Sequence, residues 1–181
     1  FCLADLEHAM VLSTLKLLRL HFQMQVQADA QLPAHKGDLL RMALLWHLAA
    51  FWCLEPERCG SGCRSPHDCL FGRLITPASD DNWPPAMLHL IGSTPPPCYV
   101  LWDDLDRREQ VRRGDPFSFE LILIGDEAIR QAPAFVAAAM AGGEEGLGRE
   151  GLRARLDRVD ARSGPQGESR ALFADGAWRS G

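Results

Sequence analysis

Four cysteines within one short segment are the residues of this chain best suited to chemistry. Cys53, Cys59, Cys63 and Cys69 are spaced C-x5-C-x3-C-x5-C, and mainly glycine, serine, proline and charged residues separate them. A segment so poor in apolar side chains cannot order itself by packing, so we expect a metal or disulfides to fix it. Four thiolates suit a structural Zn²⁺ ion, and His67 could replace one of them.

Other interpretations of these cysteines stay open. Disulfides would satisfy the same spacing, although six cysteines without a secretory signal favour a reducing compartment and a cytoplasmic location. An iron–sulfur cluster would also use four thiolates. Buried free thiols fit poorly in so polar a loop. Cys2 and Cys98 lie apart and are expected to be isolated core or terminal cysteines.

Length and composition predict a folded globular domain. The chain has 181 residues, of which 46% are hydrophobic and 24% charged. Its apolar runs are shorter than the ~20 residues of a membrane span, so no membrane partner is expected. The net charge of −5 argues against nucleic-acid binding over the whole surface but leaves local binding open. The start has no initiator Met and no basic leader, and indicates a piece of a longer chain.

Periodicity predicts the elements that position these residues. Residues 16–27 alternate apolar and polar side chains, which is typical of a half-buried strand. A turn follows, with Asp38 as an expected N-cap for a nearly all-apolar helix at 39–52. The other expected elements are a strand at 99–102, a polar turn at 107–114, a strand at 117–125, a helix at 129–141, a glycine loop at 142–148 and a strand at 152–161.

This order, β-α-(cysteine insertion)-β-β-α-β, predicts an α+β, ferredoxin-like domain of the RRM or RAMP type. The domain is expected to span 1–161, with a cysteine-rich insertion at about 53–75. The apolar end of the insertion is expected to pack back on the core through Leu70, Phe71, Leu74 and Ile75. Residues 162–181 are interpreted as a linker or the truncated start of a second domain.

Several motifs, in this order, resemble the CRISPR-associated endoribonucleases of the RAMP superfamily that process precursor crRNA, in their cysteine-bearing branch. They are the LP-x-x-x-G turn, the helix with its Arg, the cysteine loop closing on Leu-Phe, a proline-rich segment, a Gly-Asp and a strand ending in Leu-Ile-Gly. The matching residues are Leu32, Pro33, Gly37, Arg41, Cys53, Cys59, Cys63, Cys69, Leu70, Phe71, Pro95, Pro97, Gly114, Asp115, Leu123 and Gly125. The resemblance implies CRISPR repeat RNA as substrate, with crRNA and other CRISPR-associated proteins or fused domains as partners.

The resemblance also implies cleavage without a catalytic cofactor. The RNA 2′-OH would attack the phosphate, and the reaction needs a general base, a general acid and a cation. His47, His35 and Lys36 are the candidates, with His67 a further one, because imidazole and ammonium suit these tasks. The product would carry a 2′,3′-cyclic phosphate. The alternative is that His47 is a core-edge histidine and His35 a solvated turn residue.

Candidate RNA-binding residues come from the first strand, the first helix and the glycine loop. Glycines would let backbone amides approach phosphates and arginines would supply charge. The candidates are Arg19, Arg41, Gly146, Gly148, Arg149, Arg153 and Arg155. The polar face of the first strand carries no stacking aromatic, since Phe22 falls on its apolar side. A helix C-cap and a merely solvated strand face are the alternatives.

Two other classes of function stay open. A non-catalytic RAMP-like module would bind RNA or protein through the same fold, within a larger CRISPR protein or complex. An unrelated interaction domain would be stabilised by a metal that the cysteines bind.

Overall fold

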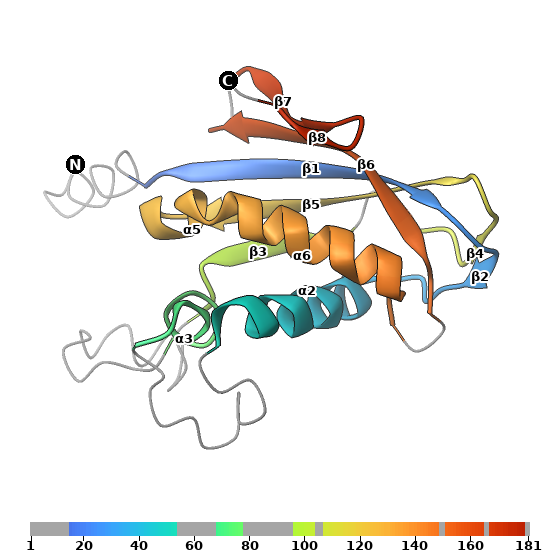
Figure 1. Ribbon diagram of the computed structural model, residues 1–181, viewed down its shortest axis with the longest axis horizontal. Coiled ribbons are helices and arrows are strands. Elements are labelled where there is room, and N and C mark those ends of the chain that lie inside the picture. Colours follow the sequence, from blue (N-terminus) through green and yellow to red (C-terminus); the bar gives the residue numbers. More distant parts are fainter. Residues whose placement is uncertain are drawn as a thin grey trace, which may run out of the picture.

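The computed structural model describes residues 15–53, 68–77, 96–103, 107–148, 151–164 and 167–179. Within these ranges an antiparallel sheet of six strands carries helices on one face (Figure 1). The sheet is formed by β1 (Leu17–Val26), β3 (Tyr99–Trp102), β5 (Pro116–Ile124), β6 (Ala154–Ser163), β7 (Ser169–Ala174) and β8 (Ala177–Trp178). The helices are α2 (Gly37–Trp52), α3 (Leu70–Leu74), α5 (Asp126–Arg130) and α6 (Ala132–Glu145). A short ribbon pairs β2 (Ala30–Gln31) with β4 (Gln110–Val111).

The strand order confirms the ferredoxin-like fold. The sheet runs β3-β5-β1-β6-β7-β8, so the four strands expected from the sequence lie side by side with β1 and β5 in the middle. Helix α2 connects β1 to β3 and α6 connects β5 to β6, which gives the β-α-β-β-α-β order of this architecture.

The alternation of β1 builds the core. Leu18, Leu20, Phe22, Met24 and Val26 are buried beneath the helices, while the intervening side chains are partly exposed. Phe22 stacks on Phe119 of β5, with ring centroids 4.6 Å apart. The predicted strands at 16–27, 99–102 and 117–125 and the helix at 39–52 are therefore confirmed, because burial follows the predicted period.

The second helical region differs from the prediction. The expected helix at 129–141 is two helices that meet at Gln131, and α6 continues to Glu145 through part of the expected glycine loop. Gly143 is buried against β6, and a Cβ added there would lie 2.2 Å from the Ala154 carbonyl oxygen. The glycine is needed because helix and strand approach closely, and this requirement outweighs its low helix propensity.

The start of α2 also differs. Its N-cap residue is Lys36, and the expected cap, Asp38, lies in the first turn without a capping hydrogen bond. The Asp38 carboxylate instead accepts a hydrogen bond from Arg41 at 3.3 Å. The negative charge of Asp38 still stabilises α2, because it lies near the positive, N-terminal end of the helix dipole.

The end of the cysteine-rich segment packs on the core as expected. Phe71, Leu74 and Ile75 are buried, and Leu70 packs against the same cluster from α3. Residues 54–67, with Cys59, Cys63 and His67, lie outside the described residues.

The last part of the chain differs from the expectation of a linker or the start of a second domain. Strand β7 pairs with β6 and β8 pairs with β7, so both extend the sheet beyond β6. Phe173 is buried, and its ring meets that of Trp178 edge-on at 5.8 Å. Among the described helices, none has the length and apolar character that crossing a bilayer requires.

Candidate functional site

The sheet face turned away from the helices, here called the open face, is polar and is covered by no described helix. Side chains that pair across neighbouring strands share a face, so the strand register defines its members. Arg19 and His21 of β1 lie opposite Ile122 and Glu120 of β5. On the other side of β1, Arg19 lies opposite Arg162 of β6 and His21 lies opposite Asp160. The open face at its centre therefore consists of Arg19, His21, Gln23, Val100, Trp102, Glu120, Ile122, Arg158, Asp160 and Arg162.

Trp102 adds a large aromatic surface to the open face. It is 48% exposed and lies opposite Glu120 of β5, which separates it from His21 of β1. The residues of β1 alone predict no stacking aromatic on this face, and the pairing of β3 with β5 that adds Trp102 is a tertiary feature. The alternation within the segment YVLW was the available signal, since it puts Val100 and Trp102 on one face.

Most charges at the centre of the open face are paired. Arg19 Nε lies 3.5 Å from Glu120 Oε2. The Asp160 carboxylate accepts hydrogen bonds from Arg158 at 2.7 Å and from the Gln23 amide at 3.1 Å. Such pairs are partly solvated and add little stability, but they fix the orientation of the side chains.

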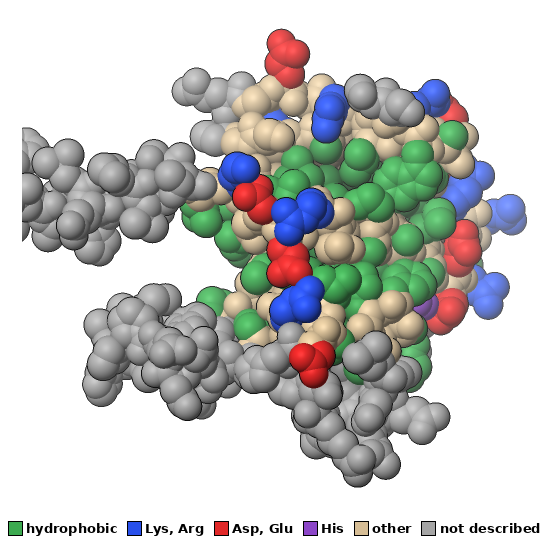
Figure 2. Space-filling model, turned by 60° about the vertical axis from the view of Figure 1, so that its left-hand side comes forward, with side chains coloured by type: hydrophobic (Ala, Val, Ile, Leu, Met, Phe, Trp, Pro, Cys, Tyr) green, Lys and Arg blue, Asp and Glu red, His purple; other side chains and the backbone are tan. Residues whose placement is uncertain are grey.

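Basic residues at one end of the molecule are also engaged. Figure 2 shows basic and acidic side chains alternating along this end, near the start of β1, α5 and α3. Lys16 lies 2.9 Å from Asp126, and Arg73 lies 2.6 Å from Glu127. This end therefore offers mixed charge rather than a basic patch.

A second candidate site lies where β1 leads into α2. A hollow of about 430 Å³ brings together an imidazole, a guanidinium, a phenol and two carboxylates, from His35, Arg41, Tyr99, Asp38 and Asp103. Burial raises the pKa of the Tyr99 phenol, and the nearby Arg41 guanidinium partly offsets that rise. The predicted residues His35 and Arg41 thus share one solvent-accessible hollow.

The other two predicted catalytic residues lie in different surroundings. Lys36 is only 1% exposed, so its ammonium is withdrawn from solvent. His47 is buried between α2 and α6, where its Nε2 lies 3.7 Å from Glu145 Oε2. His47 is ten residues beyond Gly37, which begins α2 and lines the hollow, so it lies about 15 Å farther along the helix. The structure thus brings His35 and Arg41 together and leaves His47 apart.

The predicted glycine loop is shorter than expected. Gly146 and Gly148 have positive φ values of 113° and 70°, which favour glycine. Leu147 pairs with Leu152 across this turn. Arg149 lies outside the described residues, Arg153 is exposed, and Arg155 Nε lies 3.0 Å from Asp157 Oδ1. Within the described part of this turn, positive φ and the Leu147–Leu152 pairing account for the glycines.

The predicted metal site is only partly described. Cys53 ends α2, and the Cys69 thiol accepts a hydrogen bond from the Gly72 N–H at 3.2 Å at the start of α3. Both are free thiols, and within the described ranges no group of three or more candidate ligands gathers. The other two predicted ligands, Cys59 and Cys63, lie outside the described residues, and the zinc site stays a prediction.

Comparison of structures assigns the fold to a known class. The chain has the fold of a protein described as "Crystal structure of Csm3-Csm4 subcomplex in the type III-A CRISPR-Cas interference complex", with a TM-score of 0.50. The two share 13% sequence identity over 88% of this chain and 90% of that chain. At this identity the likeness shows a shared fold.

The family follows from the sequence. The family model described as AF_1859_N, N-terminal domain, matches residues 15–180, and the chain belongs to this family. A search of curated proteins finds no match.

Proposed function

We propose that this chain is an RNA-binding domain of a CRISPR system, which binds single-stranded RNA on its open face. The observation that carries this proposal is a ferredoxin-like sheet with one face free of described helices, which carries the exposed Trp102 on β3 and the arginines Arg19 and Arg162 on β1 and β6. Sheets of this architecture bind single-stranded RNA by stacking bases on aromatic side chains. The RAMP-like fold supports the CRISPR context.

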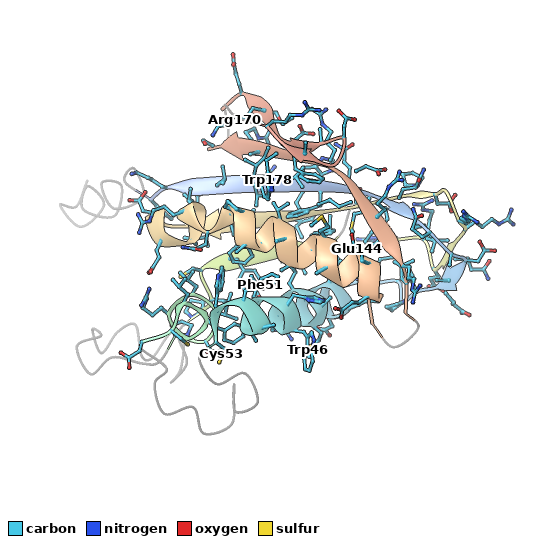
Figure 3. The ribbon with its side chains drawn as sticks, in the orientation of Figure 1. Trp46, Phe51, Cys53, Glu144, Arg170 and Trp178 are labelled. Carbon is cyan, nitrogen blue, oxygen red and sulfur yellow. The ribbon has the colours of Figure 1, made fainter. Side chains whose placement is uncertain are left out.

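Binding of labelled single-stranded RNA, followed by fluorescence anisotropy at low salt, tests this proposal. Trp102→Ala should weaken binding by about 1–3 kcal/mol, the usual contribution of one base stacked on an aromatic ring. Trp46→Ala is the matched control, because Trp46 is 73% exposed on α2 and projects away from the sheet in Figure 3. Equal affinities for both variants and the wild type would rule out the open face.

The second candidate function is the metal-independent cleavage of CRISPR repeat RNA, with its chemistry in the hollow at the start of α2. What favours it is the shared position of His35 and Arg41: the imidazole can transfer a proton and the guanidinium can stabilise the phosphorane charge. Cleavage of repeat RNA in the presence of EDTA, with a 2′,3′-cyclic phosphate on the product, tests it.

Two histidine variants sharpen that test. His35→Ala should lower the cleavage rate by about 10²–10⁴-fold, as expected for loss of a general acid or base. His47→Ala should act on stability instead, because His47 packs between α2 and α6. RNA that is bound but never cut would favour the non-catalytic module.

We further propose a structural Zn²⁺ held by Cys53, Cys59, Cys63 and Cys69. The spacing of the four cysteines supports it, with Cys53 at the end of α2 and Cys69 at the start of α3. Metal content of the freshly purified protein is the direct measurement. One zinc per chain is expected, and Cys53→Ser should remove it. A metal-free wild-type protein would exclude the site.

A further inference from the structure

Two arginines face each other directly across neighbouring strands on the open face. Arg19 of β1 and Arg162 of β6 are paired in the strand register. Like charges at directly opposed positions destabilise a sheet, because their Cβ atoms lie only about 4.5–5.5 Å apart. Such a pair therefore needs compensating negative charge.

The compensation in the protein itself is incomplete. Glu120 is the carboxylate beside Arg19, with 3.5 Å between Oε2 and Nε. Asp160, the carboxylate nearest to Arg162 along β6, is already bound by Arg158. Within the described part of the chain, Arg162 has neither an ion pair nor a side-chain hydrogen bond. Among the described residues, the Arg162 guanidinium therefore has no counter-charge of its own.

Two hollows adjoin this pair, and their linings differ. The one toward the middle of the strands, of about 250 Å³, includes the carboxylates of Glu120 and Asp160. The other, of about 240 Å³, is lined by both arginines with Leu17, Ile122 and Gly164 and contains no carboxylate. Both arginines also line the first hollow, where the two carboxylates offset their charge. In the second hollow no lining carboxylate offsets it, and the apolar neighbours strengthen the interaction of an anion with the guanidiniums.

We propose that the hollow between Leu17, Ile122, Arg19 and Arg162 is a phosphate-binding site, and that it holds a backbone phosphate of the RNA bound on the open face. Guanidinium groups bind phosphate oxygens through paired N–H donors, and two of them can clamp one phosphate. The RNA assignment rests on the proposed function. The anion site itself rests on the opposed arginines.

The test compares Arg162→Gln with Arg130→Gln, which removes the same charge from an exposed arginine at the end of α5. Anisotropy with labelled single-stranded RNA is measured over a range of salt concentrations. Arg162→Gln should weaken binding about tenfold, and should reduce the slope of log K against log[salt] by about 0.7, the value for one lost phosphate contact. Arg130→Gln should bind within about twofold of the wild type.

Folding is checked on the same variants by thermal unfolding. The Tm of Arg162→Gln should equal or exceed that of the wild type, because the substitution relieves repulsion from Arg19. Arg162→Lys keeps the charge but loses the paired donors, and should bind RNA with intermediate affinity. Unchanged affinity of Arg162→Gln, in a protein that binds RNA, would overturn the phosphate site while leaving the proposed function intact.

A separate measurement tests whether the site binds a free phosphate ion as well as the phosphate of RNA. Inorganic phosphate, at constant ionic strength, should raise the Tm of the wild type and of Arg130→Gln but not that of Arg162→Gln. This shift in a protein that binds no RNA would support the anion site and overturn its assignment to RNA. No shift together with no RNA binding would overturn both.

Discussion

The two faces of strand β1 differ in what they contribute. One face places Phe22 against Phe119 in a core from which solvent is excluded. The other face places Arg19 opposite Arg162, an arrangement that costs stability. Because the same strand carries both, its alternation separates two roles. The helix-covered face holds the fold together, and the open face, which no described helix covers, carries the proposed RNA-binding residues.

Truncation of a buried side chain on the core side of β1 should have the largest effect on stability. Phe22→Ala should destabilise the domain by about 3–5 kcal/mol, since it removes a fully buried ring and leaves a cavity. Urea denaturation followed by circular dichroism measures the loss. A cost below about 1 kcal/mol would mean that the helix-covered face does not carry the stability.

A second test addresses the contact between α6 and β6 on the covered face. Gly143→Ala should cost about 1–3 kcal/mol, because its Cβ would lie 2.2 Å from the Ala154 carbonyl oxygen. Gly142→Ala is the matched control, where the nearest atom to a new Cβ is that of Ala43 at 3.3 Å. Its stability should stay within about 1 kcal/mol of the wild type, since alanine also favours the helix. Equal losses in chemical denaturation would contradict the close approach.

A substitution on the open face should have the opposite effect on the free energy of unfolding. Arg162→Gln should leave the free energy of unfolding unchanged or raise it by up to about 1 kcal/mol, because one of two opposed like charges is removed. The gain should shrink at high salt, where charge repulsion is screened. A loss of more than 1 kcal/mol would show that this face also supports the fold.

The smallest expected effect is at high pH. Burial, followed by the negative charge of Glu127, raises the pKa of the Cys98 thiol above its ordinary value of 9.0. The folded state therefore binds a proton more tightly than the unfolded state, and stability should fall as pH rises above about 9. Cys98→Ala should make this fall shallower in urea titrations at several pH values. An identical pH dependence in both proteins would exclude Cys98 as a cause.

The sequence predicted the elements whose periodicity is complete. The alternation of residues 16–27 and 117–125 gave β1 and β5 with the correct buried faces, and the continuous apolar run at 39–52 predicted α2. It was wrong about Gly142 and Gly143, which lie within α6. Glycine is unfavourable in isolated helices, and only the packing of α6 on β6 explains its presence there.

Part of the candidate site could also be anticipated. His35 and Arg41 were selected from a turn and a helix, and they line one hollow. The sequence predicts a linker or the start of a second domain at Arg162. For Trp102 the only local signal is the alternation of YVLW, which does not say which strand lies beside it. Arg162 and Trp102 share the open face only because β6 and β3 pair on either side of β1 and β5.

By itself, the sequence determined which residues of each strand are apolar, and hence which side of the sheet is buried. Side-chain alternation is a local property of the backbone, so the sequence expresses it directly. Only the tertiary structure decided which side chains meet across strands: Arg19 with Arg162, and Trp102 with Glu120. Strand order and register depend on contacts between residues far apart in the chain, and one-residue shifts would exchange the two faces.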